Sequence, residues 1–152
     1  MRSLTTIGNG NLASGSWDRK INIWDITDGR LIRSLTGHSD CVSALVLLEN
    51  GHLASGGFDK RIKIWNTSDG TLIKILKGHT KAVQALIVLK NGFLASASWD
   101  NTIRIWNVYD GVVVKILEEH IGEVRALALF QNGYLISGSD DGTIKVWAND
   151  LK

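Results

Sequence analysis

The sequence predicts an all-β protein built from four copies of one small antiparallel sheet. The first observation is a constant step of 41 residues, which relates four tryptophans: Trp24, Trp65, Trp106 and Trp147. The second is that turn signals separate short segments rich in Val, Ile, Leu and Trp about every ten residues, as in all-β proteins. The third is that no window has apolar residues at helical spacing over helical length. A constant period of this size identifies a repeat architecture.

The unit 37–77 shows how each copy is expected to fold. Its sequence predicts four strands, which cover residues 42–48, 52–56, 62–65 and 72–76. The first strand is apolar at almost every position, so both of its faces should be buried. The third alternates apolar residues with Lys63, which predicts a lysine that points into solvent. Asn50-Gly51 and Asp69-Gly70 lie between strands and suit short turns that need positive φ.

The same pattern extends over the rest of the chain and predicts fifteen strands. Residues 3–7 align with the first strand of a unit, so the first unit should contain four strands. After Trp147 the sequence is too short for a fourth strand, so the last unit should contain three.

Three motifs within each unit resemble WD repeats. In the second unit they are Gly37-His38, the segment from Leu53 to Asp59, and Ile62-Lys63-Ile64-Trp65. Only Trp24-Asp25 spells the Trp-Asp pair, and Glu119 replaces the Gly expected before His120. The resemblance implies a β-propeller with one four-stranded antiparallel blade per repeat. One domain over 1–152 would then hold four blades, half of a closed ring, with the last blade lacking its outer strand: 1–36, 37–77, 78–118 and 119–152.

A recurrent set of Trp, Ser, His and Asp is expected to be structural. In WD repeats the equivalent residues form a buried chain of hydrogen bonds. By motif match these are His38, Ser55, Asp59 and Trp65; His79, Ser96, Asp100 and Trp106; His120, Ser137, Asp141 and Trp147; and, in the first unit, Ser14, Asp18 and Trp24. An indole N–H only donates, a hydroxyl both accepts and donates, and a carboxylate can end the chain.

Ser, His and Asp could also form a catalytic triad. An enzyme has no need to build the same triad in unit after unit, so we expect no catalytic site. Because the repeated histidines are 41 residues apart and the chain has a single cysteine, we also expect no metal site and no cofactor.

Positions at which the repeats differ are the candidates for partner binding. In WD propellers the loops before the first strands and the turns between the second and third strands gather on one face. The turns place Trp17, Phe58, Trp99 and Asp140 there, and the loops add Asp40, Cys41, Ser43, Lys81, Ala82, Gln84, Glu123 and Arg125. The aromatic residues could contact a partner or pack on a neighbouring blade, and the loop differences could be tailored or neutral.

Composition and charge exclude several classes of protein. Formal net charge is +2 with both signs interspersed, so no basic stripe indicates nucleic-acid binding. No apolar run is long enough to span a membrane as a helix. The N-terminal sequence lacks the apolar core of a signal peptide, and the single cysteine favours a reducing, intracellular location, the cytoplasm above all.

The function expected first is a non-catalytic scaffold that presents the loops of one propeller face to a protein or peptide. The alternative is a self-assembling structural unit with no external ligand. An open half-ring would expose two apolar blade faces. Two chains could cover them by forming an eight-bladed ring as a homodimer, the missing blades of a longer parent chain could cover them, or the four blades could close alone.

Overall fold

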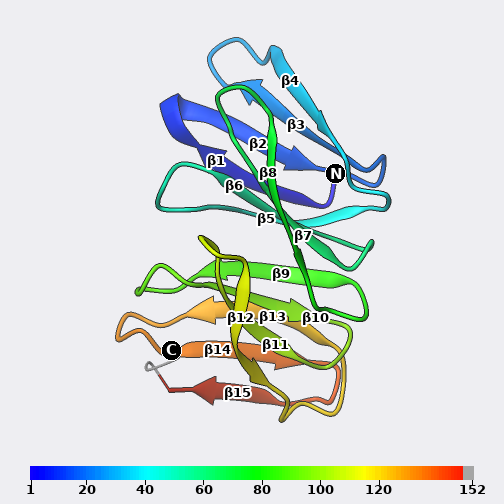
Figure 1. Cartoon of the computed structure of the whole chain (residues 1–152), viewed down its shortest axis with the longest axis vertical. Helices are drawn as coiled ribbons and strands as arrows, with labels where there is room; N and C mark the ends of the chain where they lie inside the picture. Colours follow the sequence, from blue (N-terminus) through cyan, green and yellow to red (C-terminus); the bar gives the residue numbers. More distant parts are fainter. Residues whose placement is uncertain (149–152) are drawn as a thin grey trace.

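The computed structural model describes residues 1–148, which form four β-sheets that follow one another along the long axis of the molecule (Figure 1). The all-β prediction is confirmed, because the described residues contain fifteen strands, one short 3-10 turn and no α-helix. The predicted fourth unit, 119–152, extends beyond the described part by its last four residues. The structure therefore has three sheets of four strands and one of three, each called a blade below.

The strands lie within one or two residues of their predicted positions. Blade 1 consists of β1 (Ser3–Ile7), β2 (Asn11–Gly15), β3 (Lys20–Asp25) and β4 (Leu31–Thr36), with the 3-10 turn η1 (Gly8–Gly10) after β1. Blade 2 consists of β5 (Val42–Leu47), β6 (Leu53–Gly57), β7 (Arg61–Trp65) and β8 (Leu72–Lys77). Blade 3 consists of β9 (Val83–Val88), β10 (Leu94–Ser98), β11 (Ile103–Asn107) and β12 (Val112–Leu117). Blade 4 consists of β13 (Val124–Leu129), β14 (Leu135–Ser139) and β15 (Ile144–Trp147).

Each blade is an antiparallel meander in which strands pair in the order of the sequence. The first strands, β1, β5, β9 and β13, lie next to one another from blade to blade, whereas β4, β8 and β12 lie at the outer edge. The pairing of β3 with β4 shifts register between Ile23 and Trp24, and the equivalent shifts follow Ile64 and Ile105. Such irregularities increase the local twist of a sheet.

The core of the protein lies between the blades. Each blade has a trailing face toward the next blade and a leading face toward the preceding one. Between blades 1 and 2, the trailing face supplies Ile7, Ala13, Ile21, Ile23 and Leu35, and the leading face supplies Val42, Leu53 and Trp65. The same positions recur one repeat later between blades 2 and 3, and again between blades 3 and 4. Because full burial of one such side chain contributes about 1.5–3 kcal/mol, stacking supplies much of the stability of each blade.

The prediction that Lys63 points into solvent is wrong. Its exposed fraction is 6%, and its Nζ donates a hydrogen bond to the carbonyl oxygen of Gly37. The reason is that Lys63 alternates onto the leading face, which blade 1 covers. The long apolar stem packs at this interface while the amine finds an acceptor in the loop before β5.

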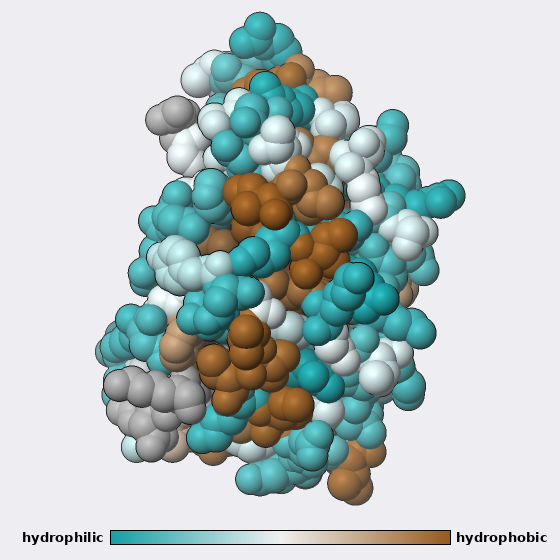
Figure 2. Space-filling view, in the orientation of Figure 1, coloured by the Kyte–Doolittle hydropathy of each residue, from teal (hydrophilic) through white to brown (hydrophobic). Residues whose placement is uncertain are grey.

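Figure 2 shows apolar patches separated by hydrophilic residues on the face that the outer strands β8 and β12 cross in Figure 1. Exposed apolar side chains on these strands are Leu72, Ile73, Ile75, Val112, Val114 and Ile116. The described residues include no helix with the length and apolar character that a membrane span requires.

Candidate functional site

Blades 2, 3 and 4 each contain a buried chain of three hydrogen bonds. In blade 2, the indole Nε1 of Trp65 donates to Ser55 Oγ at 2.8 Å, Ser55 Oγ lies 2.7 Å from His38 Nε2, and His38 Nδ1 lies 2.8 Å from Asp59 Oδ2. Blade 3 repeats these contacts with Trp106, Ser96, His79 and Asp100. Blade 4 repeats them with Trp147, Ser137, His120 and Asp141.

The hydrogen-bonding capacities of the four side chains explain their order. The indole N–H of Trp65 only donates, so Ser55 Oγ accepts from it and can donate onward to His38 Nε2. His38 Nδ1–H then donates to Asp59, whose carboxylate also accepts from the backbone N–H groups of Ser39 and Arg61. The chain therefore ties the loop before β5 to β6, to the following turn and to β7.

The carboxylates at the ends of these chains have low pKa values. Burial raises the pKa of Asp59, but hydrogen bonds from His38 and from backbone N–H groups outweigh burial, so its pKa lies below the ordinary value. The same balance lowers the pKa of Asp100 further, with Thr102 as an additional donor. For Asp141 the main cause is the hydrogen bond from the Thr143 hydroxyl. All three carboxylates are therefore ionised at neutral pH.

The order Ser–His–Asp matches that of a nucleophile, a base and an orienting carboxylate. However, Ser55 and Ser96 have exposed fractions of 0%, and Ser137 of 1%. Each hydroxyl oxygen also accepts the indole N–H of its own blade. A substrate carbonyl could not reach these oxygens, so the arrangement stabilises the blades and cannot attack a substrate in this conformation.

Blade 1 contains only part of this chain. Trp24 Nε1 donates to Ser14 Oγ at 2.8 Å, as in the other blades. Asp18 is exposed and accepts a hydrogen bond from the Lys20 backbone N–H, so the structure does not join it to the Ser14–Trp24 pair. The physical reason is that blade 1 has no histidine to bridge the hydroxyl and the carboxylate.

The aromatic residues of the turns form a continuous row across three blades. The ring centroids of Trp17 and Phe58 are 5.6 Å apart in an edge-on arrangement, and those of Phe58 and Trp99 are 4.8 Å apart and tilted. Both distances fall in the range of favourable aromatic pairs. Trp17 is nevertheless 59% exposed. Of the two interpretations left open by the sequence, packing on a neighbouring blade is what these rings show; contact with a partner stays a prediction, for which Trp17 presents surface to solvent.

Two arginines lie against these rings. The Arg2 guanidinium carbon lies 5.3 Å from the Trp17 ring centroid and 5.7 Å from that of Phe58. That of Arg125 lies 5.0 Å from the Trp99 ring centroid, and both distances suit cation–π attraction. We call Arg2, Trp17, Phe58, Trp99 and Arg125 the aromatic row. Sequence reasoning missed Arg2, although three steps of the repeat separate it from Arg125.

Asp140 occupies the position in blade 4 that the other blades fill with an aromatic ring. Arg125 Nε donates to Asp140 Oδ1 at 2.7 Å and Arg125 NH2 donates to Glu123 Oε2 at 2.7 Å. The hydrogen bond from Arg125 lowers the pKa of Asp140. Asp40 and Lys81 are exposed nearby in the loops, and Gln84 is half-buried.

In blades 2, 3 and 4, backbone hydrogen bonds hold the turn between the second and third strands against the loop before the first strand. Phe58 N–H donates to the Cys41 carbonyl at 2.9 Å, and the equivalent bonds join Trp99 to Ala82 and Asp140 to Glu123. This close approach buries the small residues of the loops. The expectation that Cys41, Ser43 and Ala82 belong to the partner-binding face is therefore wrong, because their exposed fractions are 0%, 6% and 6%. Burial also raises the pKa of the Cys41 thiol.

The sequence matches the family model described as "WD domain, G-beta repeat" (WD40) four times, over residues 2–25, 29–66, 70–107 and 111–148. These matches and the four repeated blades decide the family. The chain belongs to the WD40 repeat family. No curated protein matches the chain as a relative. WD40 repeats generally act as scaffolds for protein interactions and are typically non-catalytic. Within this WD40 chain, no group of His, Cys, Asp and Glu among residues 1–148 is arranged to hold a metal ion.

Proposed function

We propose that the protein is a non-catalytic interaction scaffold that binds a protein or peptide through its aromatic row. The observation that carries this proposal is the row itself, in which three aromatic rings from three blades lie side by side and two arginines lie against them. Trp and Arg are enriched among the residues that dominate binding energy at protein interfaces. Exposed Asp40, Lys81 and Asp140 would form the polar rim of the same surface.

The rigidity of the row supports a role in binding. The turns of Phe58 and Trp99 are held by backbone hydrogen bonds to the loops before β5 and β9, and the buried Trp–Ser–His–Asp chains fix those loops. The turn of Trp17 is held from blade 2, where the Val42 N–H donates to the Ser16 carbonyl. Aromatic rings that are already ordered lose little conformational freedom when a partner binds. We also propose that the four blades, 1–36, 37–77, 78–118 and 119–152, act together as one domain, since the row crosses three of them.

The test is binding of displayed peptides to the intact chain. Peptides selected from a random library on the wild-type protein are measured against Trp17→Ala, which removes the most exposed ring of the row. Loss of one dominant aromatic costs about 2 kcal/mol or more, so we expect affinity to fall at least ~30-fold. Trp17→Phe should retain part of the affinity because it keeps an aromatic ring.

Tyr109→Ala is the matched control. Tyr109 is 72% exposed and lies in the turn between β11 and β12, outside the aromatic row. Its replacement should leave peptide affinity unchanged. If Trp17→Ala and Tyr109→Ala behave alike while both remain folded, the row is not the binding surface and the proposal fails.

A second candidate function is self-assembly through the open ends of the blade stack. The trailing face of blade 4 and the leading face of blade 1 are both apolar and both open to solvent in the described chain. An apolar surface of this kind marks an interaction site. These faces could bind a second chain, completing an eight-bladed ring as a homodimer, or further blades of a longer parent chain.

A further inference from the structure

We propose that the two end faces bind each other in a second copy of this chain, head to tail, so that two chains form one eight-bladed ring. This inference deepens the second candidate function and rests on it, but it is independent of peptide binding by the aromatic row. It draws on the three junctions inside the chain, which show what each end face contacts when a neighbouring blade is present.

The trailing face of blade 4 has the same apolar residue types as the buried junctions between blades, but no neighbouring blade covers it in the described chain. Ile144 is 75% exposed, whereas the equivalent Ile21, Ile62 and Ile103 are exposed by at most 1%. Val146 is 63% exposed, whereas Ile23, Ile64 and Ile105 are exposed by at most 3%. Phe130 is 59% exposed, against at most 6% for Ile7, Leu48 and Leu89. Two differences within the described residues separate these positions from their buried equivalents: no blade follows blade 4, and β15 has no outer strand beside it as β3, β7 and β11 do.

The leading face of blade 1 is likewise apolar and uncovered. Met1 is 78% exposed, and its equivalents Val42, Val83 and Val124 are all 0% exposed. Leu12 and Trp24 are half-buried, whereas the equivalent leucines are completely buried and the equivalent tryptophans nearly so. Leu4, at 52% exposure, completes the face. The trailing face of blade 4 and the leading face of blade 1 are thus the two kinds of surface that pack together at each junction inside the chain.

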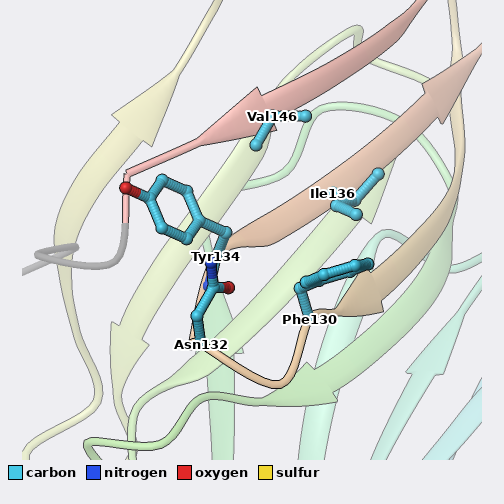
Figure 3. A pocket seen from close by; sticks show the side chains of 5 residues that line it. All are labelled: Phe130, Asn132, Tyr134, Ile136 and Val146. Atoms are coloured by element: carbon cyan, nitrogen blue, oxygen red, sulfur yellow. The ribbon is translucent and has the colours of Figure 1, made fainter.

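Both faces are hollowed where a neighbouring side chain would insert. Figure 3 shows Phe130, Ile136 and Val146 on one side of the blade 4 sheet, with Asn132 and Tyr134 at the edge of the hollow. On blade 1 a second hollow is lined by Met1, Leu4, Leu12, Trp24 and Ile26 among others. Inside the chain, the equivalent spaces are filled by the neighbouring blade.

A small residue (Gly15, Gly56, Ala97 or Gly138) marks the place of closest approach. A Cβ added at Gly15 or Gly56 would lie 2.8 Å and 2.7 Å from a Cγ of Val42 and Val83, on the leading face of the next blade. The equivalent Gly138 has only Ala126 within 4 Å, at 3.9 Å. In the proposed ring, Met1 of the second copy occupies the place of those valines.

Charge is also complementary across the proposed junction. Arg125 lies between Asp140 of its own blade and Trp99 of the preceding blade. In the single chain, Arg2 lies against Trp17 and Phe58. In the proposed ring, Arg2 of the second copy turns to the position equivalent to that of Arg125, between its own Trp17 and Asp140 of the first copy. The Asp140 side chain is 47% exposed, so its carboxylate is open to a further cation. The blade that ends the chain thus has a carboxylate where the others have an aromatic ring, opposite an arginine.

The occupant cannot be the other end of the same chain in this structure. Blade 1 and blade 4 lie at opposite ends of the long axis in Figure 1, and both end faces are open. A second copy presents both required faces in the correct register and closes both junctions at once. The resulting ring has eight blades, within the range of roughly four to eight that is typical of β-propellers.

The first test is the mass of the purified full chain, measured by size-exclusion chromatography with light scattering at micromolar concentrations. We expect one species of twice the 16.7 kDa chain mass. A monomer, or a broad distribution of larger species, overturns the proposal. Peptide binding measured on the same sample separates the two ideas, because a monomer that still binds peptides through Trp17 would leave the scaffold function standing.

The second test blocks one face at a time. Ile144→Arg adds a charge to the trailing end face and should convert the dimer to a monomer without unfolding it, because the side chain is already exposed. Val112→Arg is the matched control, since Val112 is 54% exposed on the outer strand of blade 3 and lies on neither end face. A dimer that survives Ile144→Arg but remains folded by circular dichroism contradicts the head-to-tail arrangement, even if self-assembly itself is real.

The third test establishes direction. Leu4→Arg blocks the leading end face, so it should also be monomeric alone. In a mixture of the two variants, the unchanged leading face of an Ile144→Arg chain can bind the unchanged trailing face of a Leu4→Arg chain. The mixture should therefore form a species of dimer mass, with weaker affinity than the wild type because only one of the two junctions is intact. Pairing of like faces predicts the reverse, namely that each single variant still dimerises through its intact face.

Discussion

Ser96→Ala should destabilise the protein more than the equivalent replacement in blade 1, Ser14→Ala. Ser96 Oγ accepts from Trp106 Nε1 at 2.8 Å and lies 2.7 Å from His79 Nε2. The exposed fractions of Ser96, Trp106 and His79 are 0%, 1% and 4%, so water cannot replace the lost hydroxyl. Leaving a buried polar group without a partner costs about 1–3 kcal/mol, and two groups are affected here, so we expect a loss of roughly 2–6 kcal/mol.

Ser14→Ala is the matched control, because it removes the same atom at the equivalent position of blade 1. Ser14 Oγ serves only Trp24 Nε1 in the recurrent chain, with no histidine beyond it. Trp24 is half-buried, so water can reach its surroundings. The expected cost is about 1 kcal/mol, the typical net contribution of one hydrogen bond.

The free energy of unfolding should be measured from urea titrations followed by tryptophan fluorescence, with both variants at the same chain concentration as the wild type. The midpoint should fall further for Ser96→Ala at an unchanged slope against urea. Equal losses for the two variants would show that the histidine and aspartate add nothing to the Trp–Ser pair, and the structural account of the chains would be refuted.

Three further predictions concern single positions. The folded-state pKa of Asp100 lies below its unfolded value of about 3.9, so the ionised carboxylate stabilises the fold above that value and this stabilisation is lost as pH falls. The free energy of unfolding should therefore decline below about pH 5, and less steeply in Asp100→Asn, which urea titrations at several pH values would detect. Gly56→Ala should cost about 1–3 kcal/mol because its Cβ would lie 2.7 Å from Val83, whereas Gly8→Ala should cost less than about 0.5 kcal/mol because its Cβ would have no atom within 4 Å, and equal thermal midpoints would contradict this. Lys60 is exposed at φ 66°, so Lys60→Gly should raise stability by up to about 1 kcal/mol, and a lower thermal midpoint would refute strain at this turn.

The repeat in the sequence was sufficient to predict the strands. Asn50-Gly51 and Asp69-Gly70 place turns where the structure has Gly51 and Gly70 at φ 81°, and the apolar segments between turns become strands. The same step indicated which Ser, His and Asp side chains would be brought together, because residues at equivalent positions have equivalent neighbours. Where blade 1 has no histidine, Asp18 stays in solvent.

The errors have one physical source, which is that a strand pattern does not tell what covers each face of a sheet. Alternation placed Lys63 correctly opposite Ile62 and Ile64 but could not show that blade 1 covers the leading face. Likewise, variation among the loops could not distinguish exposed Lys81 from buried Cys41. Both distinctions depend on contacts between segments that are far apart in the sequence.

Because the blades repeat, the exposure of one residue can be compared directly with that of the equivalent residue in the next blade. Ile103 and Ile144 have the same side chain on the same strand position of successive blades, yet one is completely buried and the other is 75% exposed. The difference is therefore not in the residue but in its surroundings, since within the described residues blade 4 has neither a following blade nor an outer strand beside β15. A sheet face that is exposed only to solvent is expected to carry charged residues, because exposed apolar sheet surface promotes aggregation. The apolar character of Phe130, Ile144 and Val146 therefore supports the proposal that this face packs against a leading face like that of blade 1.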